Sequence, residues 1–451
     1  MRVVIIGTGY VGLTTGVALA YVGHDVICVD KNPAIVEQLR CGRATIHEPG
    51  LDDLLAASAK RLAFQGEIPE LDGRTVVVIA VGTPPKDNGE ADMAYVDAAA
   101  REVAERVVSG AKLVIVNKST VPIGSARHVD GIVRRTLQER GVEAEVHVAS
   151  NPEFLAEGRA VRDSLYPDRI VVGAESQEAF AMLRELYAPL LEQSFDPPPA
   201  APRPDRAPLP PMITTTTTSA ELTKYAANAF LATKISFINE FSGLAERVGA
   251  DVTQVARAIG LDDRIGPRFL HAGIGWGGSC FAKDTSAIVT TAAGYGYDMG
   301  IVKSVIEANR RQRVAVVDKL QAHLKVLRGT TIGLLGLAFK GNTDDLRDSP
   351  ALTLIEVLSE KGAQVRVHDP VAMPAAQRFH PDLPVTYAEN ASELARDCDA
   401  LVIVTDWTEY RTLPWAELRA VMRGDLLLDA RNWVNPDDVR AAGLTYQGIG
   451  R

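Results

Sequence analysis

The sequence predicts an α/β protein in which two Rossmann-like, doubly wound parallel-sheet domains are bridged by an all-helical central region. Short runs of β-branched residues alternate with helical patterns over residues 1–195 and again over residues 327–451. Between these segments, residues 219–326 carry long helical patterns and no strand-like run. At 451 residues the chain is long enough for two or three domains, each with its own core.

The strands expected in the first segment are short apolar runs that end in polar, Gly or Pro residues. Ligands of open α/β sheets bind at the carboxyl edge, so these ends should gather around one crevice. This segment is therefore the predicted cofactor-binding domain. The runs are 2–6, 25–29, 75–81, 112–116, 145–149 and 169–173.

Residues 196–218 are expected to form a connector. The stretch 196–211 is so rich in proline that it can be neither a helix nor a central strand. An extended, solvated spacer is the main interpretation, and a PxxP-type ligand for an adaptor domain is the alternative. The threonine run 214–218 continues the connector and can supply a helix cap.

The central region should consist of a helix over 219–249 and a second helical stretch from roughly 283 to 326. Its long apolar faces and its position between two sheet domains predict the contact surface of a homodimer, and the candidate residues Lys224, Asn228 and Cys280 make it the expected catalytic domain.

The last segment returns to α/β, with strands at 331–336, 364–369, 399–405 and 425–430 and a helix from Ser349 to Lys361. Its stretch 333–341 has too few well-spaced glycines for a second dinucleotide site. Lys340 beside Gly341 could contact a phosphate, and a solvated lysine is the alternative.

Charge and hydropathy exclude several partners. The net charge of -9 disfavours a nucleic-acid or anionic-membrane surface, because both need a basic field. No apolar run approaches the ~20 residues of a membrane helix, and the apolar run at the N-terminus is too short for a signal peptide. We therefore expect a cytoplasmic protein with neither a nucleic-acid nor a membrane partner.

Four cysteines occur, at Cys28, Cys41, Cys280 and Cys398. None belongs to a CxxC pair or has a His at metal-ligand spacing, so no metal site is expected. A reducing cytosol also disfavours disulfides. Cys28 and Cys398 should be strand residues and Cys41 a packing or surface residue, which leaves Cys280 as the cysteine with a chemical context.

The stretch "GTGYVG" (7–12) indicates a dinucleotide site. It follows a strand, opens a helix and has the spacing G-x-G-x-x-G, and the next strand ends at Asp30, where an acid can bind both hydroxyls of an adenosine ribose. The glycines allow a pyrophosphate to approach the helix N-terminus. Since Asp30 would repel the added phosphate of NADP, NAD is the expected cofactor; Lys31 is a mild counter-signal.

Hydride transfer to a nicotinamide requires a base for the substrate hydroxyl. Lys224 and Asn228 stand four residues apart on one helix face among apolar neighbours, where burial would lower the pKa of an amine. A snorkelling lysine beside a capping-type asparagine is the equal alternative on this pattern alone.

Cys280 follows the loop 271–279, whose four glycines can wrap closely on a ligand. A helix should start near Lys283, so that its dipole and the lysine both favour thiolate. A thiolate beside a hydride acceptor suggests that an alcohol is oxidised to an aldehyde and bound as a thiohemiacetal. A second hydride transfer then gives a thioester, whose hydrolysis Asp284 could assist.

Together these motifs resemble the UDP-glucose/GDP-mannose dehydrogenase family over nearly the whole chain. The resemblance rests on eight stretches in the family's order: "GTGYVG", "VGTPP", "NKSTVPIGS", "SNPEFLAEG", "YPDRIVVG", "AELTKYAANAFLATKISFINE", "GIGWGGSCFAKD" and "GLAFKGNTDDLRDSP".

The resemblance implies an enzyme that oxidises the primary alcohol of UDP-glucose to a carboxylate with two NAD. The same chemistry on GDP-mannose or a UDP-N-acetyl sugar, and an NAD-sensing protein that has lost the chemistry, are the alternatives.

The resemblance also implies roles for particular residues. Cys280 would be the nucleophile, Lys224 and Asn228 would assist the substrate, Asp284 would handle water or protons, and Thr120 and Glu153 would position the hydrolytic water. NAD contacts are expected from Gly7, Gly9, Val11, Gly12, Asp30, Lys31, Thr83, Thr120, Glu157, Lys283 and Arg347. Substrate contacts are expected from Glu153, Phe154, Leu155, Lys224, Asn228, Arg264, Phe269, Gly273, Gly277 and Lys340.

One position departs from the family pattern. The family often has a basic residue five positions after the ribose acid, where this chain has Ile35. Lys31 is the expected substitute; without it, NAD would bind more weakly.

Overall fold

The computed structural model describes residues 1–86, 89–205 and 208–451. The chain forms two compact units. The first comprises Met1–Ala227 and Ser286–Tyr295, and the second comprises Asn228–Thr285 and Gly296–Arg451. Two helices, α8 (Thr217–Val248) and α10 (Phe281–Gly294), contribute residues to both units.

In the described residues, the sheet of the first unit has eight strands in the order β3-β2-β1-β4-β5-β6-β7-β8. Neighbouring strands run parallel except β6 and β7, which are antiparallel. This confirms the predicted α/β fold but corrects the expectation of a wholly parallel sheet. The strands are β1 (Arg2–Ile6), β2 (Asp25–Val29), β3 (Leu62–Gln65), β4 (Arg74–Ile79), β5 (Lys112–Asn117), β6 (Glu145–Ser150), β7 (Ile170–Ala174) and β8 (Met212–Thr215).

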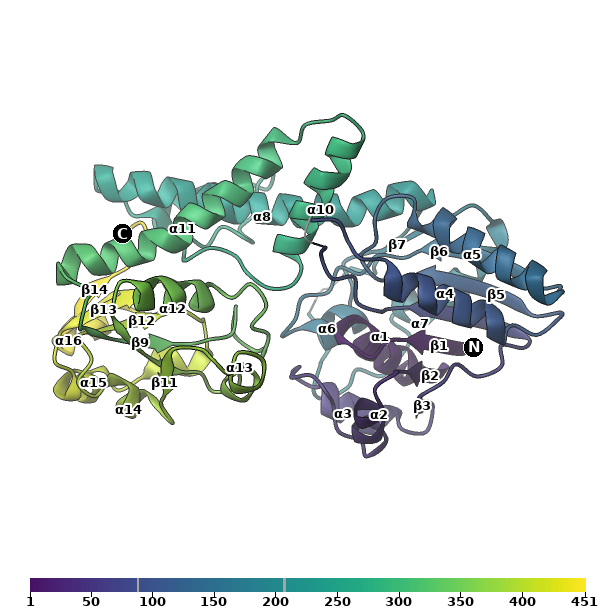
Figure 1. Cartoon of the computed structure of the whole chain (residues 1–451), viewed down its shortest axis with the longest axis horizontal. Coiled ribbons are helices and arrows are strands. Elements are labelled where there is room, and N and C mark those ends of the chain that lie inside the picture. The colour runs from purple at the N-terminus through teal and green to yellow at the C-terminus, as the bar shows by residue number, and fades with distance from the viewer. Residues whose placement is uncertain (87–88, 206–207) are drawn as a thin grey trace. The chain divides into compact units, whose positions relative to one another are not determined.

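Each face of this sheet has its own hydrophobic core, because alternate strand residues point to opposite faces. On β5, Val114 and Val116 face one core while Leu113 and Ile115 face the other. The first core is covered by α1 (Tyr10–Tyr21), α3 (Leu51–Ser58), α6 (Ala160–Leu165) and α7 (Gln177–Glu192), and the second by α4 (Ala94–Arg106) and α5 (Ser125–Arg140) (Figure 1). A further helix, α2 (Pro33–Arg40), follows β2.

Strand order places β1 between β2 and β4, so the chain leaves β1 toward one side and later returns on the other. This reversal is the topological switch point at which open α/β sheets bind ligands. The loops after β1 and β4 therefore meet at the predicted dinucleotide site.

The sheet of the second unit has, among the described residues, six parallel strands in the order β11-β10-β9-β12-β13-β14. Figure 1 shows α11 and α12 on one face of this sheet and α14 and α15 on the other. The strands are β9 (Thr331–Leu335), β10 (Gln364–His368), β11 (Val385–Tyr387), β12 (Ala400–Ile403), β13 (Leu426–Asp429) and β14 (Thr445–Gln447). The helices are α12 (Pro350–Glu360), α13 (Met373–Phe379), α14 (Ala391–Ala395), α15 (Trp415–Val421) and α16 (Pro436–Ala441).

Along the sequence, the helices that separate the strands of the two sheets are α8, α9 (Val252–Gly260), α10 and α11 (Gly300–Leu324). The predicted stretch 283–326 is thus two helices. Thr214 and Thr215 belong to strand β8 rather than to the connector, and α8 begins at Thr217. The described residues of 196–211 contain neither helix nor strand, as the prolines require.

Asp369, directly after β10, occupies the place in the second sheet that Asp30 has in the first. It is fully buried, and five donors bind its two carboxylate oxygens at 2.7–3.0 Å. The donors are the backbone N–H groups of Leu337, Ala338, Val371 and Ala372 and the indole of Trp407. This carboxylate therefore links three loops by hydrogen bonds, and both of its oxygens are already occupied, so it cannot bind a ribose.

Candidate functional site

The turn after β1 fits a pyrophosphate. Gly7 has φ +94°, and a Cβ there would lie 2.7 Å from Ala80 O, while a Cβ on Gly12 would collide with Gly7 O. A Cβ on Gly9 would meet nothing within 4 Å, so the backbone before α1 is open on that side. Gly9 is the N-cap of α1 and provides no side-chain cap, which leaves the helix N-terminus available to an anion.

Asp30 closes this turn from β2. Its Oδ2 accepts hydrogen bonds from the backbone and hydroxyl of Thr8 (3.1 and 2.6 Å), and its Oδ1 accepts one from Asn32 N (2.9 Å). Unlike Asp369, Asp30 is only partly buried, so it is oriented while still accessible to ribose hydroxyls. Lys31 forms an ion pair with Glu102 at 2.6 Å.

The other NAD residues expected in the first unit lie on its loops and on α1. Thr83 donates to the backbone oxygen of Thr120 at 2.8 Å, which joins the loops after β4 and β5. Glu157 is buried in the loop between β6 and α6, and Val11 is partly buried on α1.

Glu153 and Lys224 form a buried ion pair with an Nζ–Oε1 distance of 2.7 Å; their side chains are 6% and 4% exposed. The second oxygen of Glu153 accepts a hydrogen bond from Leu155 N (2.9 Å). Lys224 Nζ also lies 5.7 Å from the centre of the Phe154 ring. Two predicted substrate residues, Glu153 and Phe154, thus lie at the end of Lys224, and the third, Leu155, binds Glu153.

One turn before Lys224, Glu221 anchors α8 to the sheet. Its carboxylate accepts hydrogen bonds from Gly124 N (2.6 Å), Ala126 N (2.8 Å) and Ser150 Oγ (3.1 Å). Burial raises the pKa of Glu221, and these hydrogen bonds act against that rise. Since residues three apart share a helix face, the anchor fixes the rotation of α8 at Lys224.

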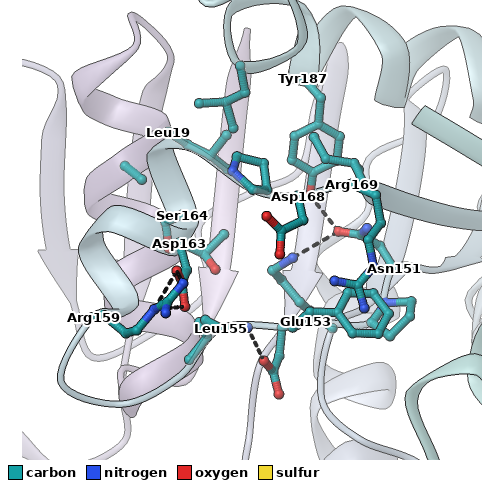
Figure 2. Close-up of a pocket in the computed structure, with 18 residues that line it drawn as sticks. Leu19, Asn151, Glu153, Leu155, Arg159, Asp163, Ser164, Asp168, Arg169 and Tyr187 are labelled. Atoms are coloured by element: carbon teal, nitrogen blue, oxygen red, sulfur yellow. Dashed lines mark hydrogen bonds and ion pairs between the residues drawn. The ribbon is translucent and has the colours of Figure 1, made fainter. Parts of the chain in front are cut away.

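A pocket of about 760 Å³, partly open to solvent, lies beside this ion pair in the first unit. Figure 2 shows Glu153 at one side of it, Asn151 and Tyr187 joined by a hydrogen bond at another, and Arg159 paired with Asp163. All of its lining residues come from the first unit.

In the second unit, Cys280 immediately precedes α10, which begins at Phe281, close to the start expected near Lys283. Its backbone oxygen accepts the hydrogen bond from Asp284 N (2.8 Å), so Cys280 caps the helix. The thiol is partly exposed and lies 3.6 Å from Ser279 Oγ. Helix N-termini favour the thiolate form, so this position suits a nucleophile.

Asp284, one turn into α10, is 1% exposed and joins two predicted residues. Asn228 Nδ2 donates to Asp284 Oδ2 at 2.6 Å, and Lys283 Nζ forms an ion pair with Asp284 Oδ1 at 2.8 Å. Asn228 lies on α8 four residues after Lys224.

The other cysteines lack such surroundings. Burial raises the pKa of Cys28 to about 12 and that of Cys398 to about 11, so both remain thiols at neutral pH. Cys41 is exposed, with its Sγ 3.7 Å from Glu37 Oε1. Among the described residues, no group of three or more His, Cys, Asp or Glu side chains could hold a metal ion.

Sequence reasoning missed the side chains that shape the glycine loop before Cys280. From α11, Asn309 bonds the backbone N and O of Trp276 (2.8 and 3.0 Å), and Arg313 donates to Trp276 O (2.6 Å). From the loop after β13, Arg431 donates to Gly275 O at 3.4 Å. No local pattern could have indicated these contacts, because they join residues at least 33 positions apart.

The glycines of this loop are required by close approach. A Cβ on Gly273 would lie 2.8 Å from Ala430 O, and one on Gly277 would collide with Asp348 O. Phe269 has φ +65° and its ring lies 6.4 Å from that of Phe281. Gly273 and Gly277 therefore hold the loop against the second sheet domain.

The remaining predicted residues of the second unit lie in charged or aromatic contacts. Arg264 pairs with Asp262 (2.6 Å) and is 88% exposed, and Arg347 pairs with Asp345 (2.7 Å). Lys340 Nζ lies 5.3 Å from the centre of the Phe339 ring.

The predicted residues are divided between the two units. The first unit holds Gly7, Gly9, Val11, Gly12, Asp30, Lys31, Thr83, Thr120, Glu153, Phe154, Leu155, Glu157 and Lys224; the second holds Asn228, Arg264, Phe269, Gly273, Gly277, Cys280, Lys283, Asp284, Lys340 and Arg347.

Comparison with known proteins assigns a family to each part of the chain. Residues 1–191 match the NAD binding domain of the UDP-glucose/GDP-mannose dehydrogenase family, residues 218–311 its central domain and residues 333–436 its UDP binding domain. Among solved structures, a UDP-glucose dehydrogenase from the hyperthermophilic archaeon Pyrobaculum islandicum is similar with a TM-score of 0.86 at 40% identity, and 100% of this chain and 97% of that chain are covered.

Curated relatives agree. The UDP-glucose 6-dehydrogenase TuaD of Bacillus subtilis is 42% identical, covering 100% of this chain and 93% of the relative. The UDP-glucose 6-dehydrogenase of Rhizobium meliloti is 44% identical, with both chains covered completely. With these matches and the open glycine turn beside Asp30, the chain belongs to the UDP-glucose/GDP-mannose dehydrogenase family, whose members are NAD-dependent nucleotide-sugar dehydrogenases.

Proposed function

We propose that this protein oxidises UDP-glucose to UDP-glucuronate, with two NAD reduced for each sugar and with Cys280 as the nucleophile. The relatives named above are UDP-glucose 6-dehydrogenases at 42% and 44% identity, which favours UDP-glucose over other nucleotide sugars. The family's UDP binding domain over residues 333–436 favours a uridine nucleotide.

NAD, bound at the glycine turn and Asp30, supplies a hydride acceptor. The chain's own task in the first oxidation is to remove the hydroxyl proton from the sugar and to stabilise charge on the oxygen. As an ammonium that Glu153 fixes at 2.7 Å, buried Lys224 is suited to stabilising the charge on the oxygen; its neutral amine form would be the one that takes up the proton. Asn228, on the same helix, would orient the sugar beside it.

Cys280 would then add to the aldehyde carbon. Its thiolate forms the C–S bond, the carbonyl oxygen takes up a proton, and the product is a thiohemiacetal. Loss of a second hydride and of the hydroxyl proton gives a thioester. Water then cleaves the C–S bond, which releases the carboxylate and returns the thiol. Asp284, with Asn228 on one oxygen and Lys283 near the other, would take the proton of that water, and Thr120 and Glu153 would help to position it.

The position of Cys280 at the start of α10 is the observation that carries this proposal, because a two-electron alcohol dehydrogenase would not need a thiol there. The test is the ratio of NADH formed to UDP-glucose consumed, measured by absorbance and by sugar analysis. A ratio of two is expected. A ratio of one with free aldehyde accumulating would contradict the four-electron reaction.

The same assay on a panel of nucleotide sugars addresses substrate identity. GDP-mannose and UDP-N-acetyl sugars belong in the panel, since a UDP-D-ManNAc dehydrogenase from Pyrococcus horikoshii has a TM-score of 0.82 at 28% identity. UDP-glucose should give the highest kcat/KM. A protein that binds NAD but produces no NADH from any sugar would instead be an NAD sensor.

The proposal extends to assembly and location. Five apolar side chains on α8 are 43–67% exposed at spacings of three, four and seven residues, a pattern typical of a helix–helix seam: Phe230, Phe237, Phe241, Leu244 and Val248. A second copy of the chain is the proposed partner for this stripe.

No helix in the described residues is long and apolar enough to cross a membrane. A cytoplasmic location is proposed because it suits an enzyme that uses NAD and a nucleotide sugar.

A further inference from the structure

The pocket beside the Glu153–Lys224 ion pair contains a lysine that the proposed reaction does not use. Lys118 directly follows β5, is partly buried, and lines the pocket together with Glu153. Its ammonium donates to Asn151 Oδ1 at 2.9 Å and lies 6.0 Å from the centre of the Tyr187 ring.

Asn151 is fixed in a single orientation. It is 1% exposed, and its Nδ2 donates to Val171 O at 2.7 Å, so Oδ1 must face the opposite way. That oxygen accepts from Lys118 and from the Tyr187 hydroxyl (2.5 Å). Burial raises the pKa of Tyr187, so this hydroxyl remains a neutral donor. The ammonium of Lys118 is therefore held in place by a rigid, uncharged partner.

Because Lys118 and Glu153 line the same pocket, a second ammonium group lies near the Glu153–Lys224 ion pair. Burial and repulsion from Lys224 lower the pKa of Lys118 to about 8, while attraction by Glu153 opposes this shift. The repulsion is mutual, so a charged Lys118 must also lower the pKa of Lys224. Other charged groups line the same pocket: the paired Arg159 and Asp163, and Asp168 and Arg169, of which Arg169 stacks on Phe154 at 3.8 Å.

We propose that Lys118 is a positioning residue of the reaction: held by Asn151, it places a second positive charge beside the Glu153–Lys224 pair and so sets the protonation state of Lys224. This proposal rests on the proposed role of Lys224. Lys118 need not touch the sugar, because its effect is electrostatic and passes through the pair. A structural lysine that only satisfies Asn151 would have no such effect.

The test compares two variants that differ in fixed charge. Lys118→Arg retains a positive charge that does not titrate, and Lys118→Met removes it. The limb of the kcat–pH profile that reports Lys224 should lie about one pH unit higher in the Met variant than in the Arg variant, with the parent between them. The direction is the same whether the reaction needs Lys224 neutral or protonated, because loss of a neighbouring positive charge raises its pKa in either case.

Tyr187→Phe is the matched control, since it removes the other hydrogen bond to Asn151 without changing charge. This variant should melt at a lower temperature but keep the limb of the parent. The proposal would be overturned if the limbs of the Met and Arg variants coincided within about 0.3 pH unit. It would also be overturned if Tyr187→Phe shifted the limb by as much as the difference between the Met and Arg variants.

A second measurement separates this inference from the proposed function. The 13Cε signal of Lys224, assigned through its loss in Lys224→Arg, can be titrated by NMR without substrate. Its pKa should again be about one unit higher in Lys118→Met than in Lys118→Arg. If no sugar yields NADH but this difference is found, the proposed function fails and the electrostatic coupling stands. Equal pKa values would refute the coupling, even in an active enzyme.

Discussion

At the scale of single residues, the chemistry depends on how differently the same side chain is placed. Cys28 and Cys398 are buried with raised pKa values, whereas Cys280 is partly exposed at the start of a helix. Asp369 is fully engaged by five donors, whereas Asp30 is oriented but accessible. Residue type alone therefore does not identify the reactive members of each set.

Cys280→Ser should fold and bind NAD but lose turnover. Serine is nearly isosteric, yet its hydroxyl is a far weaker nucleophile than a thiolate. We expect kcat to fall by roughly three orders of magnitude or more, each tenfold being about 1.4 kcal/mol in barrier. NADH formation under saturating UDP-glucose measures this. Cys41→Ser is the matched control, because Cys41 is exposed and remote from α10 in the sequence; near-parent NADH formation by the Cys280 variant would exclude the nucleophile.

NAD should be preferred over NADP because Asp30 would face the added phosphate. The carboxylate is held by Thr8 and Asn32 and cannot easily turn away, and Lys31 is paired with Glu102. We expect at least tenfold lower kcat/KM with NADP, or about 1–3 kcal/mol. Lys31→Ala should leave the ratio of the two cofactors unchanged. A parent enzyme with equal kcat/KM for both cofactors would disprove the role of Asp30.

At the scale of secondary-structure elements, α8 combines three tasks along 32 residues. Glu221 anchors it to the N-terminus of α5, Lys224 and Asn228 present polar groups one turn apart, and the exposed apolar stripe follows from Phe230.

The stripe on α8 should make the protein a dimer. Light scattering at micromolar concentration should return twice the chain mass, and Phe237→Asp with Phe241→Asp should return the mass of one chain, since two charges would be buried in an apolar seam. Tyr95→Asp is the control, because Tyr95 is 59% exposed on α4, away from the stripe in the sequence. A parent protein that is already a monomer would remove this assignment.

Most elements were predictable because apolar periodicity determines them locally. The missed strands, β3, β8, β11 and β14, are three or four residues long and each includes polar residues, whereas the equally short β12 and β13 stand in almost wholly apolar runs and were predicted. The antiparallel direction of β7 also escaped, because strand direction depends on the path of the chain rather than on the strand's own sequence. Cys280, Lys224 and the glycine turn could be proposed as site residues from spacing and from family resemblance. Lys118 and Arg313 could not, because their partners come from distant elements.

At the scale of the whole molecule, the two sheets of the same class differ in whether they can bind a dinucleotide. The first sheet carries an open glycine turn and the accessible carboxylate of Asp30. In the second sheet, the corresponding carboxylate of Asp369 is bound by the backbone of its own loops. We therefore expect calorimetry to give one NAD bound per chain. Asp30→Ala should abolish or strongly weaken that binding, and a parent stoichiometry of two would contradict this difference between the sheets.

The hydrogen bonds that close Asp369 have a consequence for the order of events in a catalytic cycle. The described part of the chain offers one dinucleotide fingerprint, whereas the proposed reaction consumes two NAD for each sugar. The spent nicotinamide must therefore be exchanged for a fresh one while the sugar is half oxidised. An aldehyde left unattached during that exchange could diffuse away or react with cellular amines. In the proposed reaction, attachment to Cys280 would retain the aldehyde while the cofactor is exchanged, so the thiol would hold the intermediate as well as act as a nucleophile.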